Sequence, residues 1–337
     1  MPARTRLHGV LVTFRRPDDL RRTLERLAEQ TRPLDSLTVV DNSPGQDVRD
    51  TLAAYSAKGF RTEHIESQDN TGPAGGLALG MSRVLESADD DDWLVVLDDD
   101  DPPRHSGLFA DALRFAEACR RVVPETGAVG TMGARFDWAT GRTVRPRDEE
   151  LVGPVAVDYI GGNRFPLYSA GALRQVGVPW PELFFGLDDL EIGLRLRRNG
   201  YALFAPGKPW AEQRRAAGRP GGPVRPSLGL DDEPSWRRYY SLRNSIVILR
   251  RYGATRTAIR VTLERGLLKP LLNAPRSPRL AMRHLRLSAE ASRDAWSGRL
   301  GRTLTPPDSS SRPASRSAGS AASAAPVTAV ERGGTSL

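Results

Sequence analysis

The feature that most constrains the fold is a regular alternation of strand-like and helix-like segments over the first hundred residues. Short apolar runs are typical of buried strands, and stretches whose apolar residues recur every three or four positions are typical of amphipathic helices. This order predicts an α/β fold with a Rossmann-like, mainly parallel sheet flanked by helices. The predicted strands are Leu7–Thr13, 36–40, 61–66 and 93–97, and the predicted helices lie around Leu20 to Leu27, at 47–58 and at 75–87.

Polar side chains follow three of these strands at the point where each strand ends. They are Asp41, Asn70 and the run Asp98, Asp99, Asp100 and Asp101. In open parallel sheets, ligands bind beyond the carboxyl ends of the strands. Three such endings in sequence predict a single site at that edge.

The acidic run at 98–101 follows a buried strand directly. Adjacent carboxylates repel one another, and a hard cation such as Mg²⁺ or Mn²⁺ relieves that repulsion through oxygen ligands. Asp98 and Asp100 are expected to face the same side and to hold the metal of a nucleotide diphosphate. The alternative is a solvated acidic turn, which is the interpretation given to 89–92 because that run precedes a strand.

A glycine-rich segment at 69–76 leads into the third predicted helix. Small residues allow a ligand to approach the backbone, and a helix N-terminus attracts phosphate. The segment is neither a P-loop nor a dinucleotide fingerprint, so by itself a plain glycine-rich turn explains it as well.

Two adjacent carboxylates, Asp188 and Asp189, begin a predicted helix at 188–199 that Gly200 ends. Neighbouring carboxylates raise at least one pKa, which suits a general base that works near neutral pH. From the spacing alone, an acidic first helical turn is the commoner explanation.

A basic helix further on carries Tyr239, Tyr240, Arg243 and Asn244. Arg243 is a candidate contact for a diphosphate or an acceptor, and the alternative is an arginine on an exposed helix face. In the second half we also expect strands at 127–136 and 155–159, a mobile loop at 216–230 and helices at 236–252, 258–272 and 281–296.

The net charge of +8 is unevenly distributed along the chain. Residues 236–304 contain 16 Lys and Arg against 3 Asp and Glu, whereas the remaining residues contain 33 against 38. A basic segment of this kind suits an anionic neighbour, such as phospholipid head groups, a lipid diphosphate or nucleic acid, or else consists of solvated arginine-rich helices. The domains are expected at 1–235 (nucleotide half 1–101, acceptor half 102–235) and 236–304, with a disordered tail at 305–337.

The single cysteine, Cys119, excludes an intramolecular disulfide framework and is expected as buried filler. No apolar stretch approaches the length of a membrane span or a signal peptide. A cytoplasmic location is therefore expected.

Taken together, these motifs resemble the family 2 glycosyltransferases with the GT-A fold, over roughly residues 7–255. The segment Val10 to Pro17 is similar to the family's first strand and turn, and Asp41-Asn42-Ser43 to its nucleotide-binding strand end. Asn70 to Gly76 resembles the glycine segment beside the nucleotide, and Asp98 to Asp101 the metal-binding Asp-x-Asp. The stretch Phe185 to Arg195 resembles the acidic catalytic motif.

The resemblance implies a role for each motif. It makes Asp189 the general base beside Asp188, and it gives Asp98 and Asp100 a divalent metal, Mg²⁺ or Mn²⁺. The residues implied in nucleotide-sugar binding are Thr13, Arg15, Asp41, Asn70, Gly72, Gly75, Gly76, Asp98 and Asp99.

One departure from the family concerns a histidine metal ligand that relatives often carry in a Trp-His-Glu-like setting. Here the corresponding stretch is Pro209-Trp210-Ala211-Glu212. Either Glu212 or water completes the metal shell, or metal binding is weakened and catalysis impaired. Trp210 and Glu212 are further candidates for acceptor or diphosphate contacts.

The resemblance implies an inverting transferase that moves a sugar from a UDP- or dTDP-linked donor to a lipid-linked or polysaccharide acceptor. The motif forms are closest to bacterial galactofuranosyl- and rhamnosyltransferases of cell-wall synthesis. The basic helices of 236–302 predict docking at the inner face of the plasma membrane, near a lipid-linked acceptor. The second interpretation is a nucleotide-sugar-binding or assembly subunit without catalysis. A nucleic-acid reader lacks a recognised motif here, and a nucleotidyltransferase lacks its early glycine-rich loop with a lysine.

Overall fold

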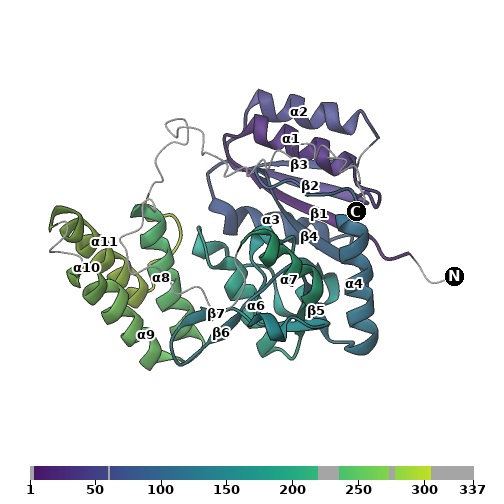
Figure 1. Cartoon of the computed structure of the whole chain (residues 1–337). Coiled ribbons are helices and arrows are strands. Elements are labelled where there is room, and N and C mark those ends of the chain that lie inside the picture. Colours follow the sequence, from purple (N-terminus) through teal and green to yellow (C-terminus); the bar gives the residue numbers. More distant parts are fainter. Residues whose placement is uncertain (1–3, 60, 219–234, 273–277, 305–337) are drawn as a thin grey trace, which may run out of the picture. The chain divides into compact units, whose positions relative to one another are not determined.

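The computed structural model describes residues 4–59, 61–218, 235–272 and 278–304. Its centre is an eight-stranded sheet in the order β3–β2–β1–β4–β9–β5–β10–β8 (Figure 1). Its strands are β1 (Leu7–Thr13), β2 (Ser36–Asp41), β3 (Thr62–Glu66), β4 (Trp93–Asp98), β5 (Thr126–Val129), β8 (Pro154–Val157), β9 (Leu167–Ser169) and β10 (Ala202–Pro206). The four strands predicted in the first hundred residues are confirmed to within one residue at each end.

The sheet contains two groups of parallel strands, β3–β2–β1–β4 and β5–β10. Strands β3, β2, β1 and β4 run parallel to their neighbours, as the strand–helix alternation predicts. Strand β9 pairs antiparallel with both β4 and β5, and β8 pairs antiparallel with β10. The parallel first group places the ends of β2, β1 and β4 side by side.

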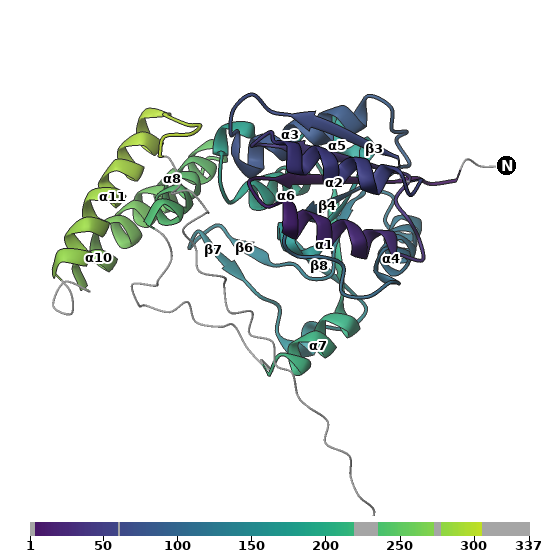
Figure 2. The ribbon, with the colours of Figure 1, turned by 90° about the horizontal axis from the view of Figure 1, so that it is seen from above.

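Helices cover both faces of the sheet (Figure 2). One face packs against α1 (Pro17–Ala28), α2 (Gln46–Ser56) and α4 (Leu108–Val122) through a core that includes Leu24, Leu52 and Phe109. Cys119 lies buried in the same core, which confirms its predicted role as filler. The other face packs against α3 (Gly72–Leu85), α5 (Ala170–Val176), α6 (Asp188–Arg198) and α7 (Gly207–Ala216).

The second half departs from the prediction in its strands. The predicted strand 127–136 is wrong, because the chain leaves the main sheet at Gly130, where a Cβ atom would lie 2.4 Å from the side chain of Ile160. Its two ends become β5 and β6 (Arg135–Asp137), and β6 forms a separate hairpin with β7 (Arg142–Val144). Strands β9 and β10 had not been predicted, since three residues and a proline-ended run give little periodicity.

The basic segment is helical, as predicted. It forms α8 (Ser235–Arg251), α9 (Thr255–Leu263), a π-helical turn (Glu264–Leu268), α10 (Lys269–Leu272) and α11 (Pro278–Ser297). Helix α8 joins the rest of the fold through a third core that contains Leu183, Leu190, Tyr240 and Ile246. Within the described ranges, no helix is long and apolar enough to span a membrane.

Two sequence predictions concern residues that the structure does not describe. The tail 305–337 lies outside the described residues, as does the predicted loop 216–230 after residue 218. The domain boundaries at 235 and 304 stay predictions.

Candidate active site

The carboxyl ends of β2, β1 and β4 bring three predicted site residues to one edge of the sheet. In the strand register, Thr13 is paired with Asp41, and Val12 with Asp98. The backbone N–H of Asn42 donates to the carbonyl of Thr13 over 2.9 Å, which fixes the loop after β2 against the end of β1. The predicted convergence of strand ends is therefore present.

Asp99 is held by the fold on both of its carboxylate oxygens. The Thr13 hydroxyl donates to Oδ2 over 3.0 Å and the Arg16 guanidinium to Oδ1 over 3.2 Å, while Thr23 donates to the backbone carbonyl. Burial raises the pKa of Asp99 to about 6, against the lowering effect of Arg16. Asp99 thus fixes the acidic turn to β1 and α1, and both of its oxygens are already occupied.

Asp98 has a different environment, because it is only partly buried and its main neighbours are acidic. Burial, followed by the charges of Asp100, Asp99 and Asp101, raises its pKa to about 7, and Asp188 adds to the effect. Neighbouring carboxylates disfavour the ionised form of Asp98, and a bound cation would favour it.

The predicted metal pair, Asp98 and Asp100, stays a prediction. Asp100 forms an ion pair with Arg16, so the two carboxylates do not share one free face. Within the described part of the chain, no group of three or more His, Cys, Asp or Glu side chains is arranged as a cation site. The chemistry of the oxygens suits Mg²⁺ or Mn²⁺, and their assignment to Asp98 and Asp100 stays a prediction.

Asp41 lies fully buried at the end of β2 with one oxygen unused. Its Oδ1 accepts from the backbone N–H of Ser43 over 2.9 Å, whereas its Oδ2 has no hydrogen-bond partner. His64 on β3 places Nε2, which likewise has no hydrogen-bond partner, 3.8 Å from that oxygen. Buried polar atoms are nearly always hydrogen-bonded. The unpaired Oδ2 of Asp41 could therefore accept a hydrogen bond from a ligand. Sequence reasoning had not assigned His64 to the site.

Arg15 follows β1 in a strained backbone conformation, with a φ of +55°. Its backbone N–H donates to the hydroxyl of Ser43 over 2.7 Å, and its side chain is exposed. Non-glycine residues at positive φ are uncommon and cluster at functional sites. Arg15 and Asp41 thus both form hydrogen bonds with Ser43, so both lie in the candidate nucleotide-binding region.

The glycine segment is explained by packing inside the protein. Gly72 has a φ of +71°, and a Cβ atom there would lie 2.1 Å from the carbonyl oxygen of Phe184. The backbone N–H of Ala74 donates to that same carbonyl over 3.3 Å. At Gly75 and Gly76, a Cβ atom would lie 2.6 Å from the side chains of Thr71 and Val12 respectively.

The predicted ligand approach at Gly75 and Gly76 is therefore corrected, because both residues are buried against the protein itself. Asn70 contributes locally, since its side-chain oxygen accepts from the N–H of Gly72 over 2.9 Å. A nucleotide contact by Asn70 or Gly72 stays a prediction. The N-terminus of α3 joins the nucleotide half to the Phe184 loop.

Asp188 and Asp189 begin α6, immediately after Leu187 at a φ of +64°. Burial raises the pKa of both carboxyl groups, and the charge of Asp189 raises that of Asp188 further. The backbone N–H groups of Leu190 and Gly162 stabilise ionised Asp189, whereas Asp98 opposes its ionisation. The structure thus brings Asp98 and the Asp188–Asp189 pair together from segments about ninety residues apart in the chain.

Arg243 and Asn244 hold the loop that precedes these carboxylates. Asn244 donates from Nδ2 to the carbonyl oxygens of Leu183, Phe185 and Gly186 over 3.1, 3.0 and 2.8 Å. Arg243 donates from NH2 to the carbonyl of Leu183 over 2.8 Å and is completely buried. Its other N–H groups reach Glu182, Asn244, Gly301 and Thr303.

Both interpretations of Arg243 from the sequence are therefore wrong. Its donors are occupied by the protein, so it neither contacts a diphosphate nor lies on an exposed face. The motif with Asn244 is a structural clamp on the loop 182–186.

Trp210 and Glu212 lie on α7. Trp210 is 2% exposed in the core beneath the sheet, which corrects its prediction as an acceptor contact. Ala211 packs against the same core, and Glu212 is exposed. A contact of Glu212 with metal or acceptor stays a prediction.

Glu191 is a buried carboxylate that the sequence pattern did not single out. It accepts from the hydroxyl of Tyr252 over 3.0 Å and pairs with Arg195 over 3.0 Å. Burial raises its pKa to about 7. Glu191 thus ties α6, two residues after Asp189, to the end of α8.

Three comparisons with known proteins find glycosyltransferases. The family described as Glycosyl transferase family 2 matches residues 10–170. Galactofuranosyltransferase GlfT1 from two Mycobacterium tuberculosis strains, CDC 1551 / Oshkosh and H37Rv, is 34% identical over 202 residues. That stretch is 57% of this chain and 64% of the relative, so the match spans less than two thirds of the relative's length.

Among solved structures, the chain is similar to the mannosyltransferase PcManGT from Pyrobaculum calidifontis, solved in complex with GDP-Man and Mn²⁺. The TM-score is 0.51 at 14% identity, covering 88% of this chain and 89% of that chain. This likeness confirms the predicted GT-A architecture of a mainly parallel sheet flanked by helices. Over residues 10–170, the chain is thus similar to glycosyl transferase family 2.

Proposed function

We propose that this protein is an inverting glycosyltransferase that moves a sugar from a nucleoside-diphosphate sugar to an acceptor hydroxyl. The observation that carries the proposal is that Asp98, at the carboxyl end of β4, lies close enough to Asp188 and Asp189 for their charges to affect one another's pKa. The family match over residues 10–170 supports the same activity. The sugar is galactofuranose, which the likeness to galactofuranosyltransferase GlfT1 supports, or rhamnose, which only the motif forms suggest.

Asp41 receives the nucleobase in this proposal. Its unused Oδ2 is a buried acceptor at the end of β2, and the imino N–H of uracil or thymine is a matching donor. Thr13 and Arg15 lie at the adjacent end of β1 and line the same region. The donor is accordingly UDP- or dTDP-linked.

Asp189 removes the proton from the acceptor hydroxyl. The freed oxygen attacks the anomeric carbon from the face opposite the leaving diphosphate, so that the C–O bond to the diphosphate breaks as the new bond forms. The proton ends on Asp189, whose raised pKa makes it a better base than an exposed aspartate. Burial, and to a lesser extent the charge of Asp98, keep the pKa of Asp189 raised.

The divalent cation would lie on Asp98, with Asp100 as its second ligand. When bound, it supplies positive charge that stabilises the departing diphosphate. Arg16 occupies Asp100 in this structure and provides a positive charge at the same turn. The proposed cofactor is Mg²⁺ or Mn²⁺.

We further propose a lipid-linked or polysaccharide acceptor and a place in cell-wall polysaccharide synthesis. The basic segment 236–304 supports a cytoplasmic protein bound peripherally to the inner face of the plasma membrane.

A second candidate function is a nucleotide-sugar-binding or assembly subunit without catalysis. Two observations favour it: Asp100 is paired with Arg16, and Ala211 stands where relatives often carry a histidine. Release of nucleoside diphosphate from UDP-, dTDP- and GDP-sugars, measured with and without Mn²⁺, separates the two. Turnover supports the transferase, whereas binding with no turnover on any donor and acceptor supports the subunit.

A further inference from the structure

Exposed apolar side chains are concentrated on the helices that follow α8. Among the described residues, thirteen large apolar side chains are exposed, and eight of them lie between residues 259 and 282. They are Ile259, Leu263, Leu267, Leu268, Leu271, Leu272, Leu280 and Met282, with exposed fractions of 37–73%. A concentration of exposed apolar side chains of this kind marks an interaction surface.

Four of these residues recur every fourth position along α9 and α10: Ile259, Leu263, Leu267 and Leu271. In a regular α-helix a spacing of four drifts by about 40° at each step, because a turn takes 3.6 residues. The π-helical turn Glu264–Leu268 is wider and absorbs part of this drift. The buried residues Ala258, Val261, Gly266 and Pro270 form the opposite side. We call the four exposed side chains the leucine stripe.

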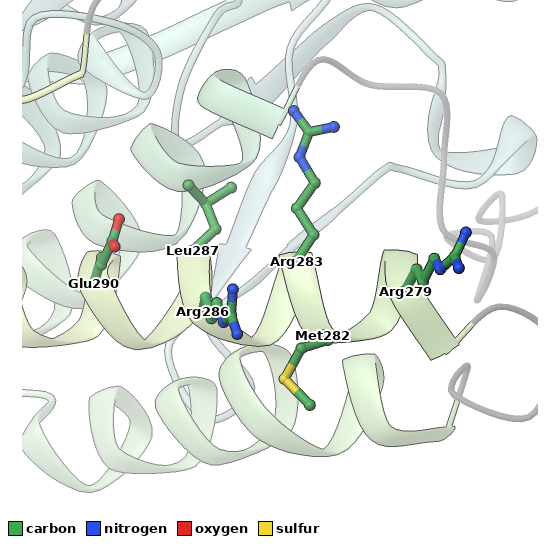
Figure 3. Close-up of a pocket in the computed structure, with 6 residues that line it drawn as sticks. All are labelled: Arg279, Met282, Arg283, Arg286, Leu287 and Glu290. Atoms are coloured by element: carbon green, nitrogen blue, oxygen red, sulfur yellow. The ribbon is translucent and has the colours of Figure 1, made fainter.

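The helices that carry the leucine stripe and the helix α11 that follows them are rich in positive charge. The stretches 255–272 and 278–297 contain eight Lys and Arg against three Asp and Glu. One of the three acids, Asp294, is buried and accepts from the hydroxyl of Tyr239, so it does not face outward. Arg279, Arg283 and Arg286 project from α11 and line a groove of 470 Å³ with Met282, Leu287 and Glu290 (Figure 3).

We propose that the leucine stripe and the arginines around it dock this protein onto an anionic phospholipid bilayer. An interfacial helix combines an apolar face that enters the acyl boundary with Lys and Arg that meet lipid phosphates. The inference rests on the proposed peripheral location, and it does not depend on the proposed transfer reaction.

Other occupants fit this surface less well. A second copy packed symmetrically would place arginines of one chain opposite arginines of the other, which is repulsive. Nucleic acid would neutralise the arginines, but it offers nothing apolar to cover the leucine stripe. An anionic bilayer offers phosphates to the arginines and acyl chains to the leucine stripe.

The first test is sedimentation of the full-length protein with vesicles of phosphatidylcholine alone or mixed with phosphatidylglycerol. The wild type should bind the mixed vesicles and not the neutral ones. The triple variant Leu263→Ser, Leu267→Ser, Leu271→Ser should bind at least tenfold more weakly, because it removes three insertable side chains. The matched control is Val122→Ser with Val152→Ser, which changes apolar side chains that are 82% and 77% exposed elsewhere.

A second variant tests the contribution of charge to vesicle binding. It replaces Arg256, Arg279 and Arg286, which are all exposed, with Gln. Each arginine should contribute about fivefold to binding at low salt. The control replaces three exposed arginines on other elements, Arg61, Arg114 and Arg121. Far-UV circular dichroism and thermal melting of every variant show whether the fold is retained.

A labelled variant tests the same proposal without removing the patch. Leu267→Cys carries an environment-sensitive fluorophore, while Cys119 stays unlabelled because it is buried and burial raises the pKa of its thiol to about 11. A blue shift on adding phosphatidylglycerol vesicles supports insertion.

Three results would overturn the proposal. They are vesicle binding that the leucine variant leaves unchanged, a probe at 267 that stays in water on bound vesicles, and a wild type that dimerises through the stripe or binds RNA while ignoring vesicles. Nucleoside diphosphate release with a soluble acceptor is measured in parallel. A wild type that releases nucleoside diphosphate but does not bind the mixed vesicles refutes the docking surface alone, and a wild type that binds these vesicles without such release refutes the proposed reaction alone.

Discussion

Asn244 on α8 donates from its side-chain amide to the carbonyl oxygen of Gly186 over 2.8 Å, two residues before the acidic pair begins. The same amide reaches the carbonyls of Leu183 and Phe185. A helix about sixty residues further along the chain therefore determines the path of the loop that presents Asp188 and Asp189. The carboxylates meet Asp98 from the opposite half of the fold because that loop is held on one side by α8 and on the other by α3.

Replacing Asn244 with Ala should lower the turnover rate far more than the affinity for nucleotide. It leaves buried carbonyl oxygens without donors, which costs about 2–4 kcal/mol of the free energy of unfolding. The loop with Asp189 would then lose its fixed position, whereas Asp41 would keep its own. Calorimetric nucleotide binding and initial rates check this. The control is Ser245→Ala, whose hydroxyl donates only to the carbonyl of Ser241 in the same helix.

Replacing Asp41 with Asn should weaken nucleotide binding at least tenfold. The amide keeps an oxygen for the backbone N–H of Ser43 and turns its NH₂ toward the base, so that a donor faces a donor. Binding of UDP and dTDP by isothermal titration measures the effect. Asp47→Asn, an exposed residue on α2, should change nothing. Equal affinities for the wild type and the Asp41 variant would remove Asp41 from the nucleotide site.

Replacing Arg16 with Gln should lower the Mn²⁺ concentration needed for half-maximal activity. Arg16 pairs with both Asp99 and Asp100, so its positive charge competes with a cation for the acidic turn. Removing one charge at this distance should change the requirement at least fivefold. Arg22→Gln, which affects only an exposed pair with Asp19 on α1, is the control. An unchanged or increased Mn²⁺ requirement would contradict the assignment of Asp100 as a ligand.

The free energy of unfolding should fall as pH rises from about 5 to about 8, in part through Glu191. Burial raises the pKa of Glu191 from 4.5 to about 7, against Arg195, Tyr252 and Arg251, which lower it. The folded protein therefore binds this proton more tightly than the unfolded chain, and the stability it gives is lost as pH rises through 7.

Glu191→Gln should flatten this pH dependence by up to about 3 kcal/mol between pH 5 and 8. Urea unfolding at several pH values measures it, and Glu182→Gln, an exposed residue, is the control. A variant that keeps the full pH dependence would show that Glu191 does not cause it.

Much of the nucleotide half was predictable from the sequence, because local periodicity determines it. The apolar run Leu7–Thr13 became β1 with the predicted bounds, and Asp41 and Asp98 came to adjacent strand ends. Parallel strands joined by helices leave little freedom in where their carboxyl ends lie. The acidic pair at 188–189 was likewise found from its position at a helix start.

Contacts between distant segments were not predictable in this way. Arg243 was predicted to contact a ligand or solvent, because nothing in a basic helix reveals that the carbonyls of 182–186 will bury it. The ion pair of Arg16 with Asp100 could not be predicted for the same reason. Nor could the close approach of the Phe184 backbone to Gly72, which the missing Cβ atom of Gly72 allows. Each depends on a partner about sixty or more residues away in the chain.

The most direct test of the central claim compares the wild type with Asp189→Asn in a transfer assay with a nucleotide sugar, Mn²⁺ and an acceptor. The wild type should release nucleoside diphosphate and give a product with inverted anomeric configuration by NMR. The variant should lose at least a hundredfold in rate and bind the nucleotide nearly as well, because only the base is removed. Full activity in the variant, or retained configuration in the product, would contradict the account.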